Sequence, residues 1–98
     1  MLTGKQRAFL RSIANGIKPI TQIGKEGVTD AFLKQLGDAL EAREIVKVTV
    51  LENSGLDVKD CANEVAQSLR AEFVQAIGSK FTIYRKSKDK PVISIPKK

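Results

Sequence analysis

One stretch, PITQIGKEGVTD at residues 19–30, decides how the chain folds, because it joins a β-prone run to the start of a helix. Residues 19–23 predict a short strand, in which Pro19 is tolerated because the first residue of a strand need not donate to the ladder. Thr29 is a good N-cap, and Asp30 places an acid in the first turn of the helix that follows. Between strand and helix lies a G-x-x-G loop, Gly24 to Gly27.

This loop has features that suit an anionic polymer. The two glycines allow positive φ angles and remove side chains that would keep a ligand's backbone away. The helix beyond them directs free N–H groups and the positive end of its dipole toward the loop, and Lys25 adds a cation. The alternative is a tight turn whose glycines serve the backbone alone. The loop matches neither a Walker A motif nor a dinucleotide-binding fingerprint.

Hydrophobic periodicity and capping residues predict the other elements. The first helix is expected to start with a capping box formed by Thr3 and Gln6, and the third with Asp57 as its N-cap. The expected elements are helices over 3–15, 30–43 and 57–71, and strands over 19–23, 44–51, 73–77 and 81–85. Strands joined through helices are normally parallel, whereas the last two strands indicate a hairpin.

The sequence therefore predicts a single compact α/β domain of order α-β-α-β-α-β-β, with a four-stranded mixed sheet and three helices. We expect this domain to span residues 1–86. Residues 87–98 are expected to form a basic C-terminal tail, either as an edge strand or as a flexible segment.

The net charge of +6 is unevenly distributed along the 98 residues. Residues 1–28 carry +4, residues 29–72 carry −4, and residues 73–98 carry +6. If the two ends meet in space, they form a basic face backed by an acidic middle, which favours a polyanionic partner. Lys5, Arg7 and Arg11 are expected on the first helix away from its apolar residues, where the alternative is an ordinary solvated face.

Other classes of function find little support in the composition. No apolar stretch approaches the roughly 18–20 residues of a membrane span, so we expect no membrane partner. The lone Cys61 cannot form an internal disulfide, which favours a reducing, cytoplasmic compartment, and we expect it in the core. The chain has no His, no cluster of metal ligands and no Ser paired with a base. We therefore expect no enzyme activity, metal or cofactor, and small-molecule phosphate chemistry is disfavoured.

Nearly the whole chain resembles the YhbY-like family, the stand-alone bacterial form of the CRM domain (chloroplast RNA splicing and ribosome maturation). The resemblance rests on residues 2–7, 9–11, 18–19, 23–29, 39–44 and 84–85. It implies a fold similar to the C-terminal domain of bacterial translation initiation factor three. It also implies association with ribosomal RNA in precursors of the large ribosomal subunit, with the G-x-x-G loop as an RNA-contacting element. Glu26 departs from the small neutral residue of many relatives and leaves Lys25 as the loop's only cation.

Residues and resemblance together predict recognition of the phosphate backbone of structured RNA by a monomer, with no preference for DNA. The predicted RNA-binding residues are Gly24, Lys25, Glu26, Gly27, Thr29, Lys5, Arg7, Arg11, Lys18, Arg85 and Lys86. The cations before the loop contribute if the first helix lies beside it. Such contacts give affinity and register rather than sequence information, so binding should weaken steeply with salt.

Two other binding functions fit parts of the chain. The acidic second and third helices could dock on ribosomal or assembly proteins through Glu41, Glu44, Asp60 or Glu64, and such binding would survive RNase treatment. The basic tail could adsorb to a membrane surface, although it lacks a basic amphipathic helix.

Overall fold

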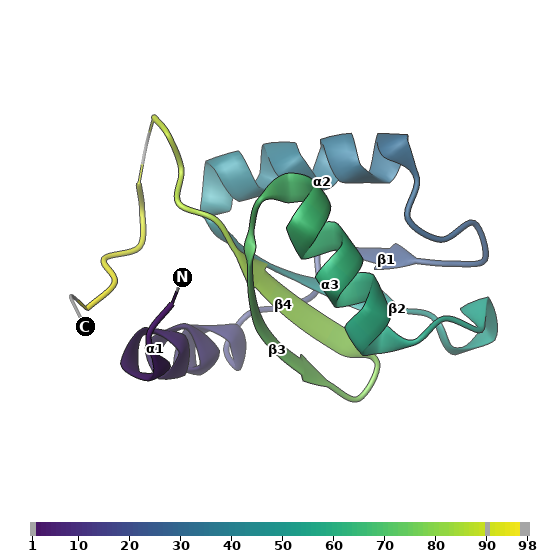
Figure 1. Ribbon diagram of the computed structural model, residues 1–98, viewed down its shortest axis with the longest axis horizontal. Coiled ribbons are helices and arrows are strands. Elements are labelled where there is room, and N and C mark those ends of the chain that lie inside the picture. The colour runs from purple at the N-terminus through teal and green to yellow at the C-terminus, as the bar shows by residue number, and fades with distance from the viewer. Residues whose placement is uncertain (1, 90, 97–98) are drawn as a thin grey trace.

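The computed structural model describes residues 2–89 and 91–96, and it has the predicted order of elements (Figure 1). The helices are α1 (Gly4–Ala14), α2 (Asp30–Arg43) and α3 (Val58–Leu69), and a short 3₁₀ helix, η1 (Glu52–Ser54), precedes α3. The strands are β1 (Thr21–Ile23), β2 (Ile45–Val50), β3 (Glu72–Ile77) and β4 (Lys80–Tyr84). The prediction of a single α/β domain with a four-stranded mixed sheet and three helices is confirmed.

The strands lie in the order β1-β2-β4-β3. β1 pairs with β2 in parallel, whereas β4 is antiparallel to both β2 and β3. The second strand of the hairpin therefore inserts between β2 and β3, and β1 and β3 form the two edges of the sheet. The carboxyl ends of β1 and β2 lie at the same end of the sheet, where the G-x-x-G loop begins (Figure 1).

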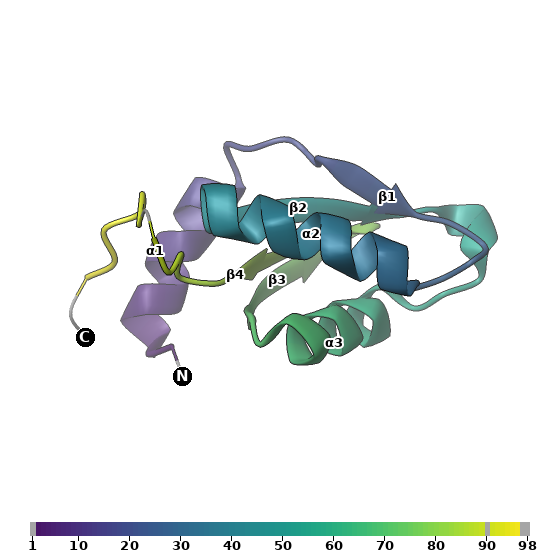
Figure 2. The same ribbon diagram turned by 90° about the horizontal axis from the view of Figure 1, so that it is seen from above.

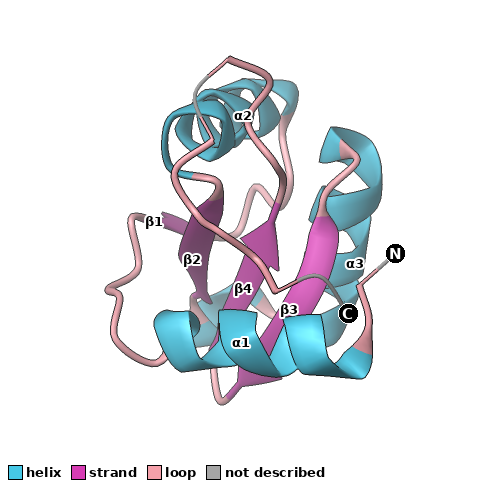
Figure 3. Ribbon diagram, turned by 90° about the vertical axis from the view of Figure 1, so that its left-hand side faces the viewer, coloured by secondary structure: helices cyan, strands magenta, loops and turns pink. Residues whose placement is uncertain are grey.

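The helices cover the two faces of the sheet unequally. α2 and α3 pack on one face (Figure 2), and the larger core cluster beneath them includes Leu36, Val48 and Phe81. α1 lies on the other side of the sheet (Figure 3), where Leu10 and Ala14 pack against Ile45, Val74 and Tyr84. α1 thus covers the end of this face where β2 begins and β4 ends.

The predicted caps explain where the helices begin. The Thr3 hydroxyl accepts the Gln6 N–H and the Gln6 side chain accepts the Thr3 N–H, which completes the capping box. The side chains of Thr29 and Asp57 accept backbone N–H groups in the first turns of α2 and α3. None of the helices in the described part of the chain is long and apolar enough to cross a membrane.

Most of the expected boundaries differ from the observed ones by one or two residues, and two of these differences bear on the site. β1 begins at Thr21 rather than Pro19, although the Ile20 N–H still donates to the Lys47 carbonyl at 2.9 Å. The second strand was expected from residue 44, but Glu44 ends α2 instead, with a φ of 67° and a fully buried side chain. The expectation that Glu44 belongs to an accessible acidic surface is therefore wrong.

The described residues after β4 form no strand and are held against α2 by two carboxylates. Glu44 accepts the N–H of Ser87 at 2.7 Å on one oxygen and the N–H groups of Val92 and Ile93 on the other. Glu41 accepts the Ser87 hydroxyl at 2.6 Å and the backbone N–H groups of Lys88 and Asp89. Four acids were proposed for docking on a protein. Of these, only Asp60 and Glu64 are exposed and have side chains that make no hydrogen bond to another described residue.

Candidate nucleic-acid interface

The two glycines of the G-x-x-G loop have different roles. The Gly27 N–H donates to the Gly24 carbonyl at 3.0 Å, which closes a tight turn. Gly27 has a φ of +73°, a conformation that side chains rarely adopt, whereas Gly24 has no such angle. A Cβ on Gly24 would make an ordinary contact with Leu51 at 3.6 Å. Only Gly27 is therefore required for the shape of the turn.

The loop borders an open cavity of ≈ 490 Å³ at the N-terminus of α2. The cavity is lined by loop residues together with Gln22, Thr29, Phe32, Leu51 and Asn53. The Thr29 hydroxyl accepts the Phe32 N–H at 3.1 Å. Within the described chain, the N–H groups of Asp30 and Ala31 have no hydrogen-bond acceptor. Unpaired donors at a helix N-terminus favour a bound anion.

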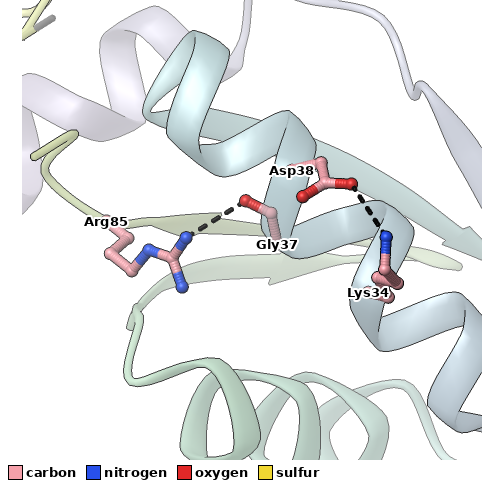
Figure 4. Close-up of polar contacts among 4 residues, drawn as sticks. All are labelled: Lys34, Gly37, Asp38 and Arg85. Atoms are coloured by element: carbon pink, nitrogen blue, oxygen red, sulfur yellow. Dashed lines mark hydrogen bonds and ion pairs between the residues drawn. The ribbon is translucent and has the colours of Figure 1, made fainter. Parts of the chain in front are cut away.

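The charges around this cavity are mixed. Lys25 and Glu26 are both exposed, and Asp30 is the first residue of α2. The only ion pair among the described residues joins Lys34 to Asp38 at 4.0 Å (Figure 4), so Lys25 is not held by an acid. Because Glu26 and Asp30 weaken the local positive potential, an anion here would depend on Lys25 and on the backbone donors.

The cations of α1 were expected to contribute to RNA binding at the loop if α1 lies beside it. The structure shows that α1 does not lie beside the loop. α1 packs over Ile45 at the start of β2, whereas the loop follows Ile23, which pairs with Val50 at the other end. The two ends of β2 are separated by roughly 17 Å, at about 3.3 Å per residue. Lys18 follows α1 and borders a separate cavity with Arg43 and Ile45, also at the start of β2.

Arg7 is the one cation of α1 whose exposure to solvent the helical pattern predicted wrongly. It was expected to face away from the apolar residues, but it is half-buried, and its Nε is removed from solvent without a partner in the described chain. Seven residues make almost two helical turns, so Arg7 lies only about 20° around the helix from the buried Ala14. Lys5 and Arg11 are exposed as expected.

Arg85 has a role inside the fold that the sequence did not indicate. Its guanidinium donates to the Gly37 carbonyl at 3.1 Å (Figure 4) and to the Leu69 carbonyl at 2.9 Å, which ties the residue after β4 to α2 and to the end of α3. A Cβ on Gly37 would approach the Leu69 side chain to 3.4 Å, so this glycine allows the two helices to pack closely. Lys86, the residue after Arg85 in the chain, is exposed.

No sequence pattern identified the part of the sheet that α1 leaves uncovered as a candidate binding surface. On this face the pairing places Gln22 beside Thr49, Thr49 beside Lys80, and Lys80 beside Ile77. This row starts two residues before the loop and crosses the whole sheet. The alternation of residues 45–50 did indicate that Lys47 and Thr49 face away from the main core. It could not indicate whether a helix covers them.

Together these features define a small, basic α/β domain in which a G-x-x-G loop joins an edge strand to a helix, with further cations at the opposite end of the sheet. The chain belongs to the CRS1 / YhbY (CRM) domain family, whose model matches residues 2–85.

Two relatives and one solved structure match over almost their full length. The chain is 47% identical over 96 residues to the protein named Probable RNA-binding protein YqeI of Bacillus subtilis (strain 168), covering 98% of this chain and 100% of that one. It is 30% identical over 97 residues to a Haemophilus influenzae protein named RNA-binding protein, covering 99% and 97%. The solution structure of SAV1595 from Staphylococcus aureus is similar with a TM-score of 0.82 and 49% identity, covering 98% and 100%.

Proposed function

We propose that this protein binds structured RNA by its phosphate backbone, with the G-x-x-G loop as the principal contact. The observation that carries the proposal is the loop itself, where an unpaired lysine borders an open cavity at the N-terminus of α2, a helix whose first two N–H groups are uncommitted within the described chain. Two relatives that match nearly the whole chain are named RNA-binding proteins, which supports the same conclusion.

In this proposal a phosphate oxygen accepts the N–H groups of Asp30 and Ala31 while Lys25 neutralises its charge. Gly27 allows the RNA backbone to approach, because no Cβ projects from the turn. The same physics operates in the G-x-x-G loop of KH domains, which clamps about four backbone nucleotides. Here a strand leads into the loop and a helix follows it.

Lys5, Arg11, Lys18 and Lys86 are exposed and belong to a second basic region, at the end of the sheet covered by α1. An RNA that reaches both regions must extend along β2, which favours a folded RNA over a short single strand. Backbone contacts supply affinity without reading bases, so recognition depends on RNA shape and on salt. The partner we propose is ribosomal RNA in precursors of the large subunit, as the family resemblance implies.

The test is fluorescence-anisotropy binding to a structured fragment of large-subunit ribosomal RNA over a series of salt concentrations. Lys25→Glu should weaken binding by more than about 1 kcal/mol, about fivefold, because it replaces the phosphate's cation with an anion. Arg70→Glu is the matched control, since it makes the same change in net charge at an exposed residue that ends α3. Equal affinities of wild type and Lys25→Glu would show that the loop is only a turn.

The ribosomal part of the proposal needs a separate measurement. Tagged protein should co-sediment with precursors of the large subunit in a sucrose gradient, and RNase treatment should release it. Association that survives RNase and is lost on replacing Asp60 and Glu64 would support docking on a protein instead.

A further inference from the structure

Another cavity, of ≈ 240 Å³, lies on the face of the sheet that α1 leaves uncovered. Its walls come from the neighbouring strands β2, β4 and β3 and from the end of α1. The lining residues are Asn15, Lys47, Gln75, Ile77, Lys80 and Thr82. The strand pairing brings them together, because Thr82 lies opposite both Lys47 and Gln75, and Lys80 lies opposite Ile77.

Thr82 indicates that this cavity is a binding site rather than a gap between side chains. It is fully buried, yet its hydroxyl has no hydrogen-bond partner among the described residues. Valine has nearly the same shape and would fill this position in a sheet without a polar atom. A buried hydroxyl with no partner is costly, and such groups in folded proteins call for an explanation such as a bound ligand.

An amide pair forms another wall of the cavity. The Gln75 side-chain N–H₂ donates to the Asn15 side-chain carbonyl at 3.3 Å, which brings the two amides together. This bond leaves the Gln75 carbonyl oxygen and the Asn15 N–H₂ group without partners in the described chain. Both residues line the cavity, so its wall carries one available acceptor and one available donor, and the Watson–Crick edge of a base presents the complementary pair.

The remaining walls suit the rest of a nucleotide. Ile77 is 63% exposed and offers an apolar surface on which the flat face of a base can rest. Lys47 and Lys80 bring two cations to the site, neither of which belongs to an ion pair in the described structure. Lys80 also belongs to the row of residues that leads back to Gln22 and the G-x-x-G loop.

We infer that this cavity binds one unstacked base of the RNA, with Gln75, Asn15 and Thr82 hydrogen-bonding its edge. The inference rests on the proposed function and adds base recognition to it, whereas the loop contacts only phosphates. The two lysines bind the phosphates that flank the base, and the row from Gln22 to Ile77 carries the RNA from the loop to the cavity.

Four hairpin RNAs with one common stem and loops made only of A, C, G or U test this inference. Wild-type protein should prefer one loop base by about tenfold, the scale of a good pair of hydrogen bonds to a base edge. Thr82→Val and Gln75→Leu should each reduce that preference to within about twofold and leave the salt dependence unchanged. Thr21→Val is the control, because it removes a half-buried hydroxyl from the opposite face of the sheet.

The outcomes separate this inference from the function on which it rests. If the wild type binds every hairpin with steep salt dependence but the variants keep its base preference, or if it has none, the base site is wrong and the loop proposal stands. If the wild type binds no hairpin, both fail. Melting curves check that each variant folds, and Thr82→Val should melt at or above the wild-type temperature because it removes an unpaired buried hydroxyl.

A titration followed by NMR examines the cavity directly. The side-chain N–H₂ signals of Asn15 and Gln75 should shift on addition of at least one of AMP, CMP, GMP or UMP, and should not shift with inorganic phosphate. Equal shifts with phosphate alone would show that the cavity binds an anion and not a base, and would overturn the inference.

Discussion

At the scale of single residues, the G-x-x-G loop distinguishes a glycine that the backbone requires from one that it does not. Gly27 has a positive φ, and Gly24 does not. A Cβ has room at either position, since its nearest contacts would be 3.9 Å and 3.6 Å away. The two sites therefore differ in backbone conformation and hardly at all in space, which makes them a matched pair for mutation.

Gly27→Ala should destabilise the protein by about 1–2 kcal/mol, the cost of placing an L-residue in the left-handed region. Gly24→Ala should leave stability within about 0.5 kcal/mol of wild type. Urea denaturation of the two variants measures both values. Equal destabilisation would contradict the assignment of distinct roles. If Gly24→Ala is stable yet binds RNA more weakly, Gly24 serves the ligand rather than the fold.

At the scale of elements, Arg85 joins three pieces of secondary structure with one side chain. Its two hydrogen bonds reach carbonyls on α2 and α3 from the end of β4. The Gly37 carbonyl lies in the middle of α2, so this bond is additional to the normal helical pattern. The close packing of Gly37 against Leu69 supports the same junction.

Arg85→Ala should lower the free energy of unfolding by about 2–4 kcal/mol, because each of two charge-assisted hydrogen bonds contributes about 1.5–3 kcal/mol and the bonds are not additive. Arg85→Lys should recover less than half of that loss, since one ammonium cannot reproduce the two-pronged geometry of a guanidinium. Arg70→Ala serves as the control at the exposed arginine that follows α3. An Arg85→Ala variant as stable as Arg70→Ala would show that the junction does not depend on these bonds.

The elements themselves were largely predictable from the sequence, because their signals are local. Thr3, Thr29 and Asp57 all cap helices as expected, and the alternation of residues 45–50 identified β2. The roles of Glu44 and Arg85 were not predictable, since their partners lie 43 to 49 and 16 to 48 residues away in sequence. No local pattern encodes such contacts.

The candidate site was predictable in part for the same reason. The loop, its helix cap and its lysine are contiguous in sequence, so one motif identified all of them. Whether α1 lies beside this loop depends on which end of the sheet its apolar side chains cover, and only the tertiary packing decides that. The cavity that contains Thr82 requires the register of three strands and was not detected.

At the scale of the whole molecule, two carboxylates on α2 hold the tail in place. Burial alone would raise the pKa of Glu44, but the N–H groups of Ser87, Ile93 and Val92, with Lys86 nearby, together bring that pKa below its usual value of 4.5. The hydrogen bond from the Ser87 hydroxyl is the main reason why the pKa of Glu41 is also lowered. Both groups therefore hold the tail most strongly when ionised.

This arrangement makes stability depend on pH in a defined direction. A carboxyl whose pKa is lower in the folded state contributes stability that is complete above its unfolded pKa and is lost as the pH falls through its folded pKa. The urea midpoint should therefore be constant from about pH 7 to pH 5.5 and should fall below about pH 4.5. Urea titrations at a series of pH values, from about pH 7 to below about pH 4.5, measure this midpoint.

Glu44→Gln should cost about 2 kcal/mol at pH 7, because one amide oxygen cannot accept all three N–H groups and a buried donor is left unsatisfied. It should also flatten the decline below pH 4.5. Glu64→Gln, at an exposed position on α3, should change neither quantity. A Glu44→Gln variant with the wild-type pH profile would show that the tail contact does not set the acid sensitivity.

The position of α1 has a consequence for how the chain acquires its fold during translation. α1 precedes the other elements of the domain, but the residues against which Leu10 and Ala14 pack include Val74 and Tyr84, which come after all three helices in the sequence. The apolar side of this helix therefore stays uncovered while α2, α3 and the strands between them are synthesised, and such surfaces invite misassociation and chaperone binding. A nascent chain stalled before Tyr84 emerges from the ribosomal exit tunnel should leave α1 open to protease, and a chain stalled well beyond it should not.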